Sequence, residues 1–186
     1  ANPQICLFMK KMLLAIGVIF ALLTNIRSQN LLLSPAELKK QVVYQNQERA
    51  LKHKAHVYLL KLEQQEVNPS FLLHFPNLQY LELWENQLKA LPQNINELNK
   101  LQVLISKKNP IDSLPENFSS LRHLRYITIT GSRLTSLPDD FGQLKSLKHC
   151  ILKDNKLEDL PASFGQLKDL HTLVLSKNRL RHFPEE

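Results

Sequence analysis

The sequence is poor in the residues that carry covalent or metal chemistry. Its 186 residues include 2 cysteines and 4 glycines. Two cysteines cannot form a disulfide framework, and no Gly-rich phosphate loop, nucleophile elbow or HExxH motif occurs. The 7 histidines are not accompanied by a complete set of metal ligands. We therefore expect a protein that is not an enzyme and that uses neither a cofactor nor a metal.

Long apolar runs are also missing. The run from Met12 to Leu23 has 12 residues, whereas a membrane-spanning helix needs about 20. Lys10 and Lys11 precede it, and a basic start before a short apolar core is typical of a secretory signal peptide. We predict that residues 1–28 are upstream residues plus a signal peptide starting at Met9, with no membrane span in the mature chain. A buried N-terminal helix is the alternative.

Charge of one sign is not in large excess. The formal net charge is +7, and three of the bases, Lys10, Lys11 and Arg27, lie in the predicted signal segment. Binding of nucleic acid would need clustered bases with stacking aromatics on one face. We therefore expect no nucleic-acid partner.

What the chain does contain is a 23-residue phrase that recurs from Leu78 onward. Its copies begin at Leu78, Leu101, Leu124, Leu147 and Leu170. They follow L-x-x-L-x-L-x-x-N-x-L-x-x-L-P-x-x-Φ-x-x-L-x-x, where Φ is apolar. This period and pattern are the signature of a leucine-rich repeat solenoid.

The repeats divide the chain. Residues 29–56 are predicted to be a helical N-terminal flank or cap, with helices near 35–44 and 47–54, because Ser34, Pro35 and Glu37 form a helix-start signal. Such a cap would cover the exposed edge of the first repeat. Leucine-rich repeats are predicted over 57–186, as 57–77 (two residues short), 78–100, 101–123, 124–146, 147–169 and a partial 170–186.

Each repeat is expected to give one strand and one return segment. Alternation in Tyr80–Trp84 turns Leu81 and Leu83 inward. Proline after the leucine of position fourteen, as in Leu91-Pro92, opens the return segment because proline cannot continue a central strand. The predicted fold class is α/β: a curved solenoid with parallel strands on its concave face and short helices or 3-10 turns on its convex face.

Some repeat positions depart from the pattern. Gln65 and Ser132 replace the asparagine of position nine, so we expect a weaker turn there. Ser106 stands at a core leucine position and is expected to be a local weak point. Cys150 stands at another and is expected to be a small buried apolar residue.

The repeats resemble a known family. The segments LPDDFGQLKSL and LPASFGQLKDL are similar to the 23-residue leucine-rich repeats of the Ras-suppressor and plant disease-resistance type, and very similar units occur in secreted bacterial proteins. The flank QERALKHKAHVYLLKL also resembles the lead-in of such bacterial proteins. The resemblance implies protein recognition with partners that differ from case to case, a secreted or bacterial cell-envelope location, and no catalytic residues.

Positions three, five and seven of each repeat are predicted to line the concave face. Tryptophan and tyrosine are enriched in binding hot spots, and Trp84 is the single tryptophan. The alternative is that aromatic and β-branched residues there simply favour strands. The predicted partner-binding residues are Tyr80, Glu82, Trp84, Ile105, Lys107, Tyr126, Thr128, His149, Ile151 and Lys153.

These observations predict a protein-protein interaction module that binds a protein partner through its concave face. A structural spacer or scaffold in the cell envelope is one alternative, and the recognition part of a truncated secreted effector enzyme is another. The unfinished last repeat would leave an open apolar edge, so self-association through it is a further expectation. Its residues are Leu170, Leu173, Leu175, Leu180 and Phe183.

Overall fold

The computed structural model describes residues 32–182, so the predicted signal peptide lies outside the described residues. The chain divides into a unit of residues 1–32 and a unit of residues 33–186, and the second holds all the strands. Among the described residues, no helix combines the length and apolarity needed to cross a bilayer.

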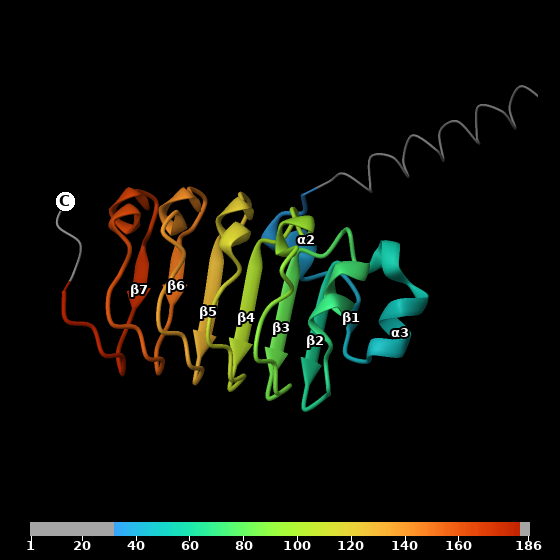
Figure 1. The fold of residues 1–186 in the computed structure, drawn as a ribbon. Coiled ribbons are helices and arrows are strands. Elements are labelled where there is room, and N and C mark those ends of the chain that lie inside the picture. The colour runs from blue at the N-terminus through green and yellow to red at the C-terminus, as the bar shows by residue number, and fades with distance from the viewer. Residues whose placement is uncertain (1–31, 183–186) are drawn as a thin grey trace, which may run out of the picture. The chain divides into compact units, whose positions relative to one another are not determined.

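Seven parallel strands form one open sheet in which spatial order equals chain order (Figure 1). The strands are β1 (Val43–Tyr44), β2 (Leu59–Glu63), β3 (Tyr80–Trp84), β4 (Val103–Lys107), β5 (Tyr126–Thr130), β6 (His149–Ile151) and β7 (Thr172–Val174). Equivalent repeat positions pair with each other, as Tyr80 does with Leu59 and with Val103. The predicted solenoid of parallel strands is confirmed.

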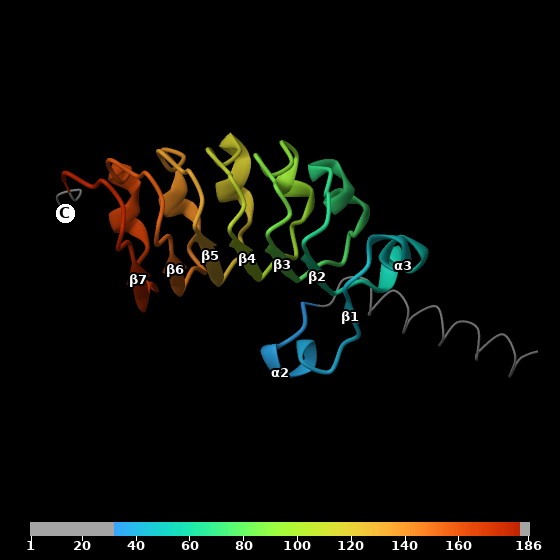
Figure 2. The same cartoon turned by 90° about the horizontal axis from the view of Figure 1, so that it is seen from below.

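The return segments run along the side of the solenoid opposite the sheet (Figure 2). They contain the 3-10 helices η2 (Pro69–His74), η3 (Ile95–Glu97), η4 (Glu116–Ser120), η5 (Phe141–Gln143) and η6 (Ala162–Gln166). Phe118, Phe141 and Phe164 stack in this layer, with ring centroids 6.2 and 5.9 Å apart and nearly parallel planes. The apolar Φ position of the repeat therefore builds the core of the helical side.

Each repeat has a residue with left-handed backbone at position eight, which directly follows the strand in β2 to β5. Gly131 has φ of 63° there, while the other repeats use non-glycine residues with φ between 51° and 60°. These are Gln64, Glu85, Lys108, Asp154 and Lys177. A left-handed residue cannot continue a strand, so it turns the chain into the return segment.

Asparagines at position nine hold this turn. The Asn109 side chain accepts from the backbone N–H groups of Asn86 (2.8 Å) and Leu88 (3.3 Å), and it donates to the carbonyl of Leu83 (3.1 Å). Asn155 and Asn178 make equivalent bonds two and three repeats further on. Ser106 also accepts from Asn109, at 3.0 Å, so the buried serine that breaks the leucine pattern has a hydrogen-bond partner.

The N-terminal flank is less helical than the sequence suggests. Helix α2 (Pro35–Leu38) has the expected capping box between Ser34 and Glu37. It ends at Leu38, so the helix predicted to reach residue 44 is wrong beyond that point. β1 pairs with β2 instead, in keeping with the strand preference of β-branched Val43. Helix α3 (Gln47–Lys52) and η1 (Lys54–His56) follow.

The last repeat is the least enclosed. β6 and β7 have three residues each, whereas β2 to β5 have five each. Leu170, Leu175 and Leu180 are partly buried against the core, and Leu173 is 39% exposed.

Candidate functional site

The strand register gathers most of the predicted contact residues on one surface. We call this surface, the outward side of β2–β6, the strand face; it is the face that was expected to be concave. Pairing sets Tyr80, Val103, Tyr126 and His149 side by side. It likewise aligns Glu82 with Ile105, Thr128 and Ile151, and Trp84 with Lys107. Lys153 lies two residues beyond the end of β6, although it is exposed.

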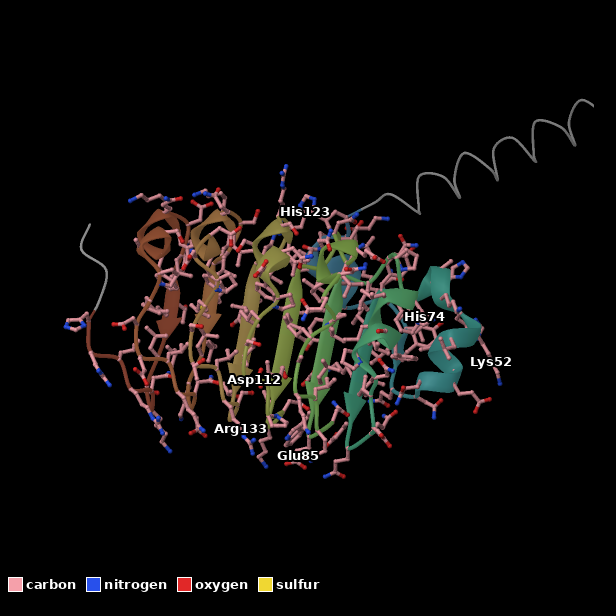
Figure 3. All side chains as sticks on the ribbon, in the orientation of Figure 1. Lys52, His74, Glu85, Asp112, His123 and Arg133 are labelled. Carbon is pink, nitrogen blue, oxygen red and sulfur yellow. The ribbon has the colours of Figure 1, made fainter. Side chains whose placement is uncertain are left out.

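Trp84 is the most exposed aromatic side chain of the strand face. It is 38% exposed, and the ammonium groups of Lys107 and Lys108 lie 6.0 and 5.8 Å from its ring centroid. Lys108 also forms an ion pair with Glu85 at 2.6 Å. Figure 3 shows Glu85 at the end of the sheet where the strands finish. Trp84 is therefore an exposed apolar ring bordered by positive charge.

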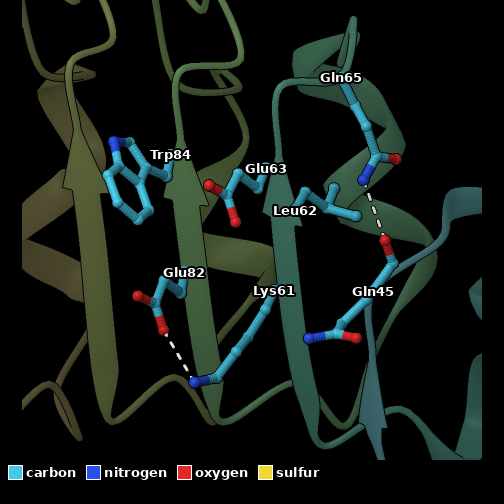
Figure 4. Close-up of a pocket in the computed structure, with 7 residues that line it drawn as sticks. All are labelled: Gln45, Lys61, Leu62, Glu63, Gln65, Glu82 and Trp84. Carbon is cyan, nitrogen blue, oxygen red and sulfur yellow. Dashed lines mark hydrogen bonds and ion pairs between the residues drawn. The ribbon is translucent and has the colours of Figure 1, made fainter.

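A hollow of about 430 Å³ lies beside Trp84, and we call it the Trp84 hollow (Figure 4). Its lining comes from β2, β3 and the turns around them: Gln45, Lys61, Leu62, Glu63, Gln65, Glu82 and Trp84. Gln65 donates to the carbonyl of Gln45 at 2.9 Å, which fixes one wall. Glu63 is exposed and forms no ion pair within residues 32–182, so its charge is available to a partner.

Tyr80, Glu82 and Lys61 form a connected group. Lys61 lies 3.0 Å from the Glu82 carboxylate and 5.3 Å from the Tyr80 ring centroid, and the Tyr80 hydroxyl donates to Glu82 at 2.9 Å. Burial raises the pKa of Glu82, but the hydrogen bonds from Lys61 and Tyr80 outweigh burial and lower it overall. Burial, and then the bond to Glu82, raise the pKa of Tyr80.

Tyr126 of β5 and His149 of β6 pack ring against ring, with their planes tilted by 31°. Their ring centroids are 4.4 Å apart, and His149 Nδ1 lies 3.0 Å from the Thr172 hydroxyl. His171 lies 6.3 Å from His149, but residues 32–182 contain no group of three His, Cys, Asp or Glu side chains that could hold a metal. Tyr126 is 36% exposed and is thus the second accessible aromatic on the strand face.

Some predicted contact residues have little free surface. Thr128 is only 7% exposed, and Ile105 and Ile151, its partners on the flanking strands, are half-buried. Strands about 4.8 Å apart let larger neighbours cover a small side chain. The accessible part of the strand face is therefore at its Trp84 and Tyr126 ends, not at its centre.

A second hollow was not predicted from the sequence. We call it the flank groove: it lies between the N-terminal flank and the position-three residues of the strands, and its volume is about 670 Å³. Leu38 and Val43 form one side, and Leu59, Val103 and Tyr126 form the other. The flank and the strands are far apart in sequence, so no local motif indicates this groove.

Comparisons with known proteins agree with this architecture. A model of the family described as leucine-rich repeat region matches residues 116–185. No curated protein matches the chain. Solved structures of leucine-rich repeat proteins do match it.

The plant peptide hormone receptor RGFR1, in complex with RGF2, matches 77% of this chain at 21% identity and a TM-score of 0.61. The ectodomain of the receptor kinase GASSHO1/SCHENGEN3 from Arabidopsis thaliana, in complex with CASPARIAN STRIP INTEGRITY FACTOR 2, matches 73% at 21% identity and a TM-score of 0.56. Internalin C2 of Listeria monocytogenes matches 69% at 19% identity and a TM-score of 0.58. The chain spans 26%, 20% and 57% of these chains, respectively, which is less than two thirds of each. At such identities the likeness shows the fold alone, and that fold is the leucine-rich repeat solenoid.

Proposed function

We propose that this protein is an interaction module that binds a protein partner through its strand face. The observation that carries the proposal is the exposed ring of Trp84, bordered by two lysines and by a hollow with an exposed glutamate, Glu63. Tryptophan is the residue type most often found at the energetic centre of protein interfaces, because its large ring loses much water-exposed area on binding.

The contact surface that we propose runs from the Trp84 hollow to Tyr126. It includes the predicted residues Tyr80, Glu82, Ile105, Lys107, His149, Ile151 and Lys153, with Thr128 as a minor contributor because it is nearly covered. Two of the structural neighbours are described as plant receptors in complex with RGF2 and with CASPARIAN STRIP INTEGRITY FACTOR 2, which is in keeping with a binding role.

The proposed location is secreted or at a bacterial cell envelope. It rests on the sequence of residues 9–28, where two lysines precede a short apolar run. The division into signal peptide, flank and repeats is part of the same proposal. N-terminal sequencing of the secreted protein would test it, with a new N-terminus near Gln29 as the expected result and an intact residue 9 in the released protein as the contrary one.

The binding proposal is tested by a pull-down with the variant Trp84→Ala/Tyr80→Ala. The bait is the purified chain, and the prey is an envelope or host-cell extract. Loss of an anchor residue costs at least about 2 kcal/mol of binding free energy, or roughly 30-fold in affinity. The partner should therefore be retained by the unaltered protein and lost from the variant.

A matched control is Arg122→Ala/Lys145→Ala, which alters two exposed residues beside η4 and η5, on the helical side. It should retain the partner. Equal retention by both variants, with unfolding midpoints near that of the unaltered protein, would refute binding through the strand face.

Self-association is a second candidate, because Leu173 of β7 exposes 39% of its surface. Sedimentation at high protein concentration should then reveal dimers that Leu173→Glu abolishes. Monomers alone would contradict this candidate.

A further inference from the structure

The flank groove has an apolar floor and a charged rim of one sign. Leu38, Val43, Leu59 and Val103 supply apolar lining, and Lys39, Arg125 and Lys148 stand around it. Among the residues that line the groove there is no carboxylate. Lys39, Arg125 and Lys148 are exposed and form no ion pair within residues 32–182. The groove is therefore complementary to a ligand that is both apolar and acidic.

Two glutamine side chains at the strand starts bind the backbone of the N-terminal flank. The Leu33 N–H donates to Gln79 Oε1 at 2.8 Å, and Gln102 Nε2 donates to the Leu33 carbonyl at 2.7 Å. Gln102 also donates to Gln79 at 2.8 Å, and both glutamines are almost fully buried. Two glutamine side chains thus bind both polar groups of one residue in a passing chain. Figure 2 shows the result: α2 lies on the strand side of the solenoid, away from the 3-10 helices.

These glutamines belong to a column that continues past the flank. Gln79 and Gln102 stand at position two of their repeats, and the next two residues at that position are Arg125 and Lys148. Parallel register sets this column along the strand starts, because Tyr126 and His149 pair directly. Leu33 of the flank binds the two glutamines of this column. Beyond them, the position-two side chains are cations instead of amides.

We infer that the flank groove binds an acidic peptide segment, with an apolar side chain against Leu38 and Val103 and a carboxylate on Arg125 and Lys148. The inference rests on the proposed function and names the chemistry of the partner. Complementary charge would speed the encounter and fix the direction of the peptide, while burial of the apolar side chain would supply affinity. A peptide is favoured over a lipid surface because the site is recessed and the same column already binds backbone.

The test is selection of a random twelve-residue peptide library on the purified chain. Selected peptides are expected to combine Asp or Glu with a neighbouring large apolar residue. Calorimetry with one selected peptide should then give an affinity that Arg125→Glu/Lys148→Glu lowers by about tenfold or more, since two attractions become repulsions.

Arg122→Glu/Lys145→Glu is the matched control, because it makes the same charge change three residues earlier in the chain at each position, on the helical side. It should leave peptide affinity unchanged. Selection of basic or purely polar peptides, or equal binding by both charge-reversed variants, would overturn the inference. Binding to vesicles of anionic phospholipid with no peptide selected would also overturn it, in favour of a membrane surface.

The outcome can be separated from that of the proposed function by Trp84→Ala alone, because Trp84 does not line the flank groove. If Trp84→Ala abolishes capture of the partner while Arg125→Glu/Lys148→Glu still binds peptide normally, the strand face stands and the groove inference fails. If neither set of variants changes any binding, both fail.

Discussion

Lys61 and Glu82 face each other across β2 and β3, with the Lys61 ammonium 3.0 Å from the Glu82 carboxylate. Lys61 lines the Trp84 hollow and also the flank groove. Lys61 therefore stands at the junction of the two hollows. A partner that contacts Trp84 and a peptide that enters the flank groove would meet the same lysine.

The pair should make stability depend on pH. The pKa of Glu82 is held below its ordinary value of 4.5, so its ionised form is favoured by folding. That stabilisation is present above about pH 4.5 and is lost as the pH falls through the lower pKa of the folded state. In urea unfolding between pH 7 and pH 3, Glu82→Gln should lose less stability on acidification than the unaltered protein.

Glu63→Gln is the control for this comparison, because it removes an exposed carboxylate from the same hollow without breaking an ion pair. Its stability should fall with acid as steeply as that of the unaltered protein. If the stability of Glu82→Gln falls with acid as steeply as that of the unaltered protein, the Lys61–Glu82 pair does not stabilise the fold.

Asn109 is expected to be a stability centre of the turns. Asn109→Ala leaves buried N–H groups of Asn86 and Leu88 and the Leu83 carbonyl without their partner. The expected loss is about 3 kcal/mol in the free energy of unfolding, measured by urea titration. Ser132→Ala removes one hydrogen bond, to the Asn109 carbonyl, and should cost only about 1 kcal/mol. Similar losses of stability for the two variants would argue against the position-nine asparagines as the main support of the turns.

Gly142 and Gly165 hold the same position in two successive repeats, but they should tolerate substitution by alanine differently. A Cβ at Gly142 would lie 1.8 Å from the Ser163 carbonyl oxygen, whereas one at Gly165 would meet nothing within 4 Å. Backbone must move in the first case, so Gly142→Ala should destabilise by about 1–3 kcal/mol or more. Gly165→Ala should change stability by less than about 1 kcal/mol. Thermal unfolding of both variants decides this, and equal midpoints would contradict the close stacking of η5 on η6.

Cys150 should be chemically silent in the folded protein. It is fully buried, and burial raises the pKa of its thiol to about 12. The thiolate is the reactive form, so a thiol reagent at pH 8 should modify Cys150 only after unfolding. The variant Cys6→Ser should be used, because Cys150 is then the single cysteine and all labelling reports on it. Rapid labelling of that variant without denaturant would show that the last repeats open readily.

The core of the repeats could be predicted because the 23-residue period repeats each environment. Leu81, Leu83 and Cys150 are buried as the alternation indicates, and Asn109 and Asn155 hold the turns that follow. Local pattern suffices for these residues, because each is fixed by neighbours one repeat away.

The site was predicted less completely, for identifiable physical reasons. Thr128 faces outward in register, but its size lets flanking isoleucines cover it. Lys108 was not among the predicted contact residues because it stands in the turn, outside the strand columns. The flank groove depends on hydrogen bonds between Leu33 and residues 46 and 69 positions away. Neither periodicity nor a capping signal carries information on contacts of that range.

Site-specific photo-crosslinking tests the central claim, binding through the strand face, most directly. A photoreactive phenylalanine analogue would replace Trp84 in one protein and Arg122, on the helical side, in another. Binding through the strand face predicts a crosslinked partner from position 84 and none from position 122. A crosslink from position 122 alone would contradict it.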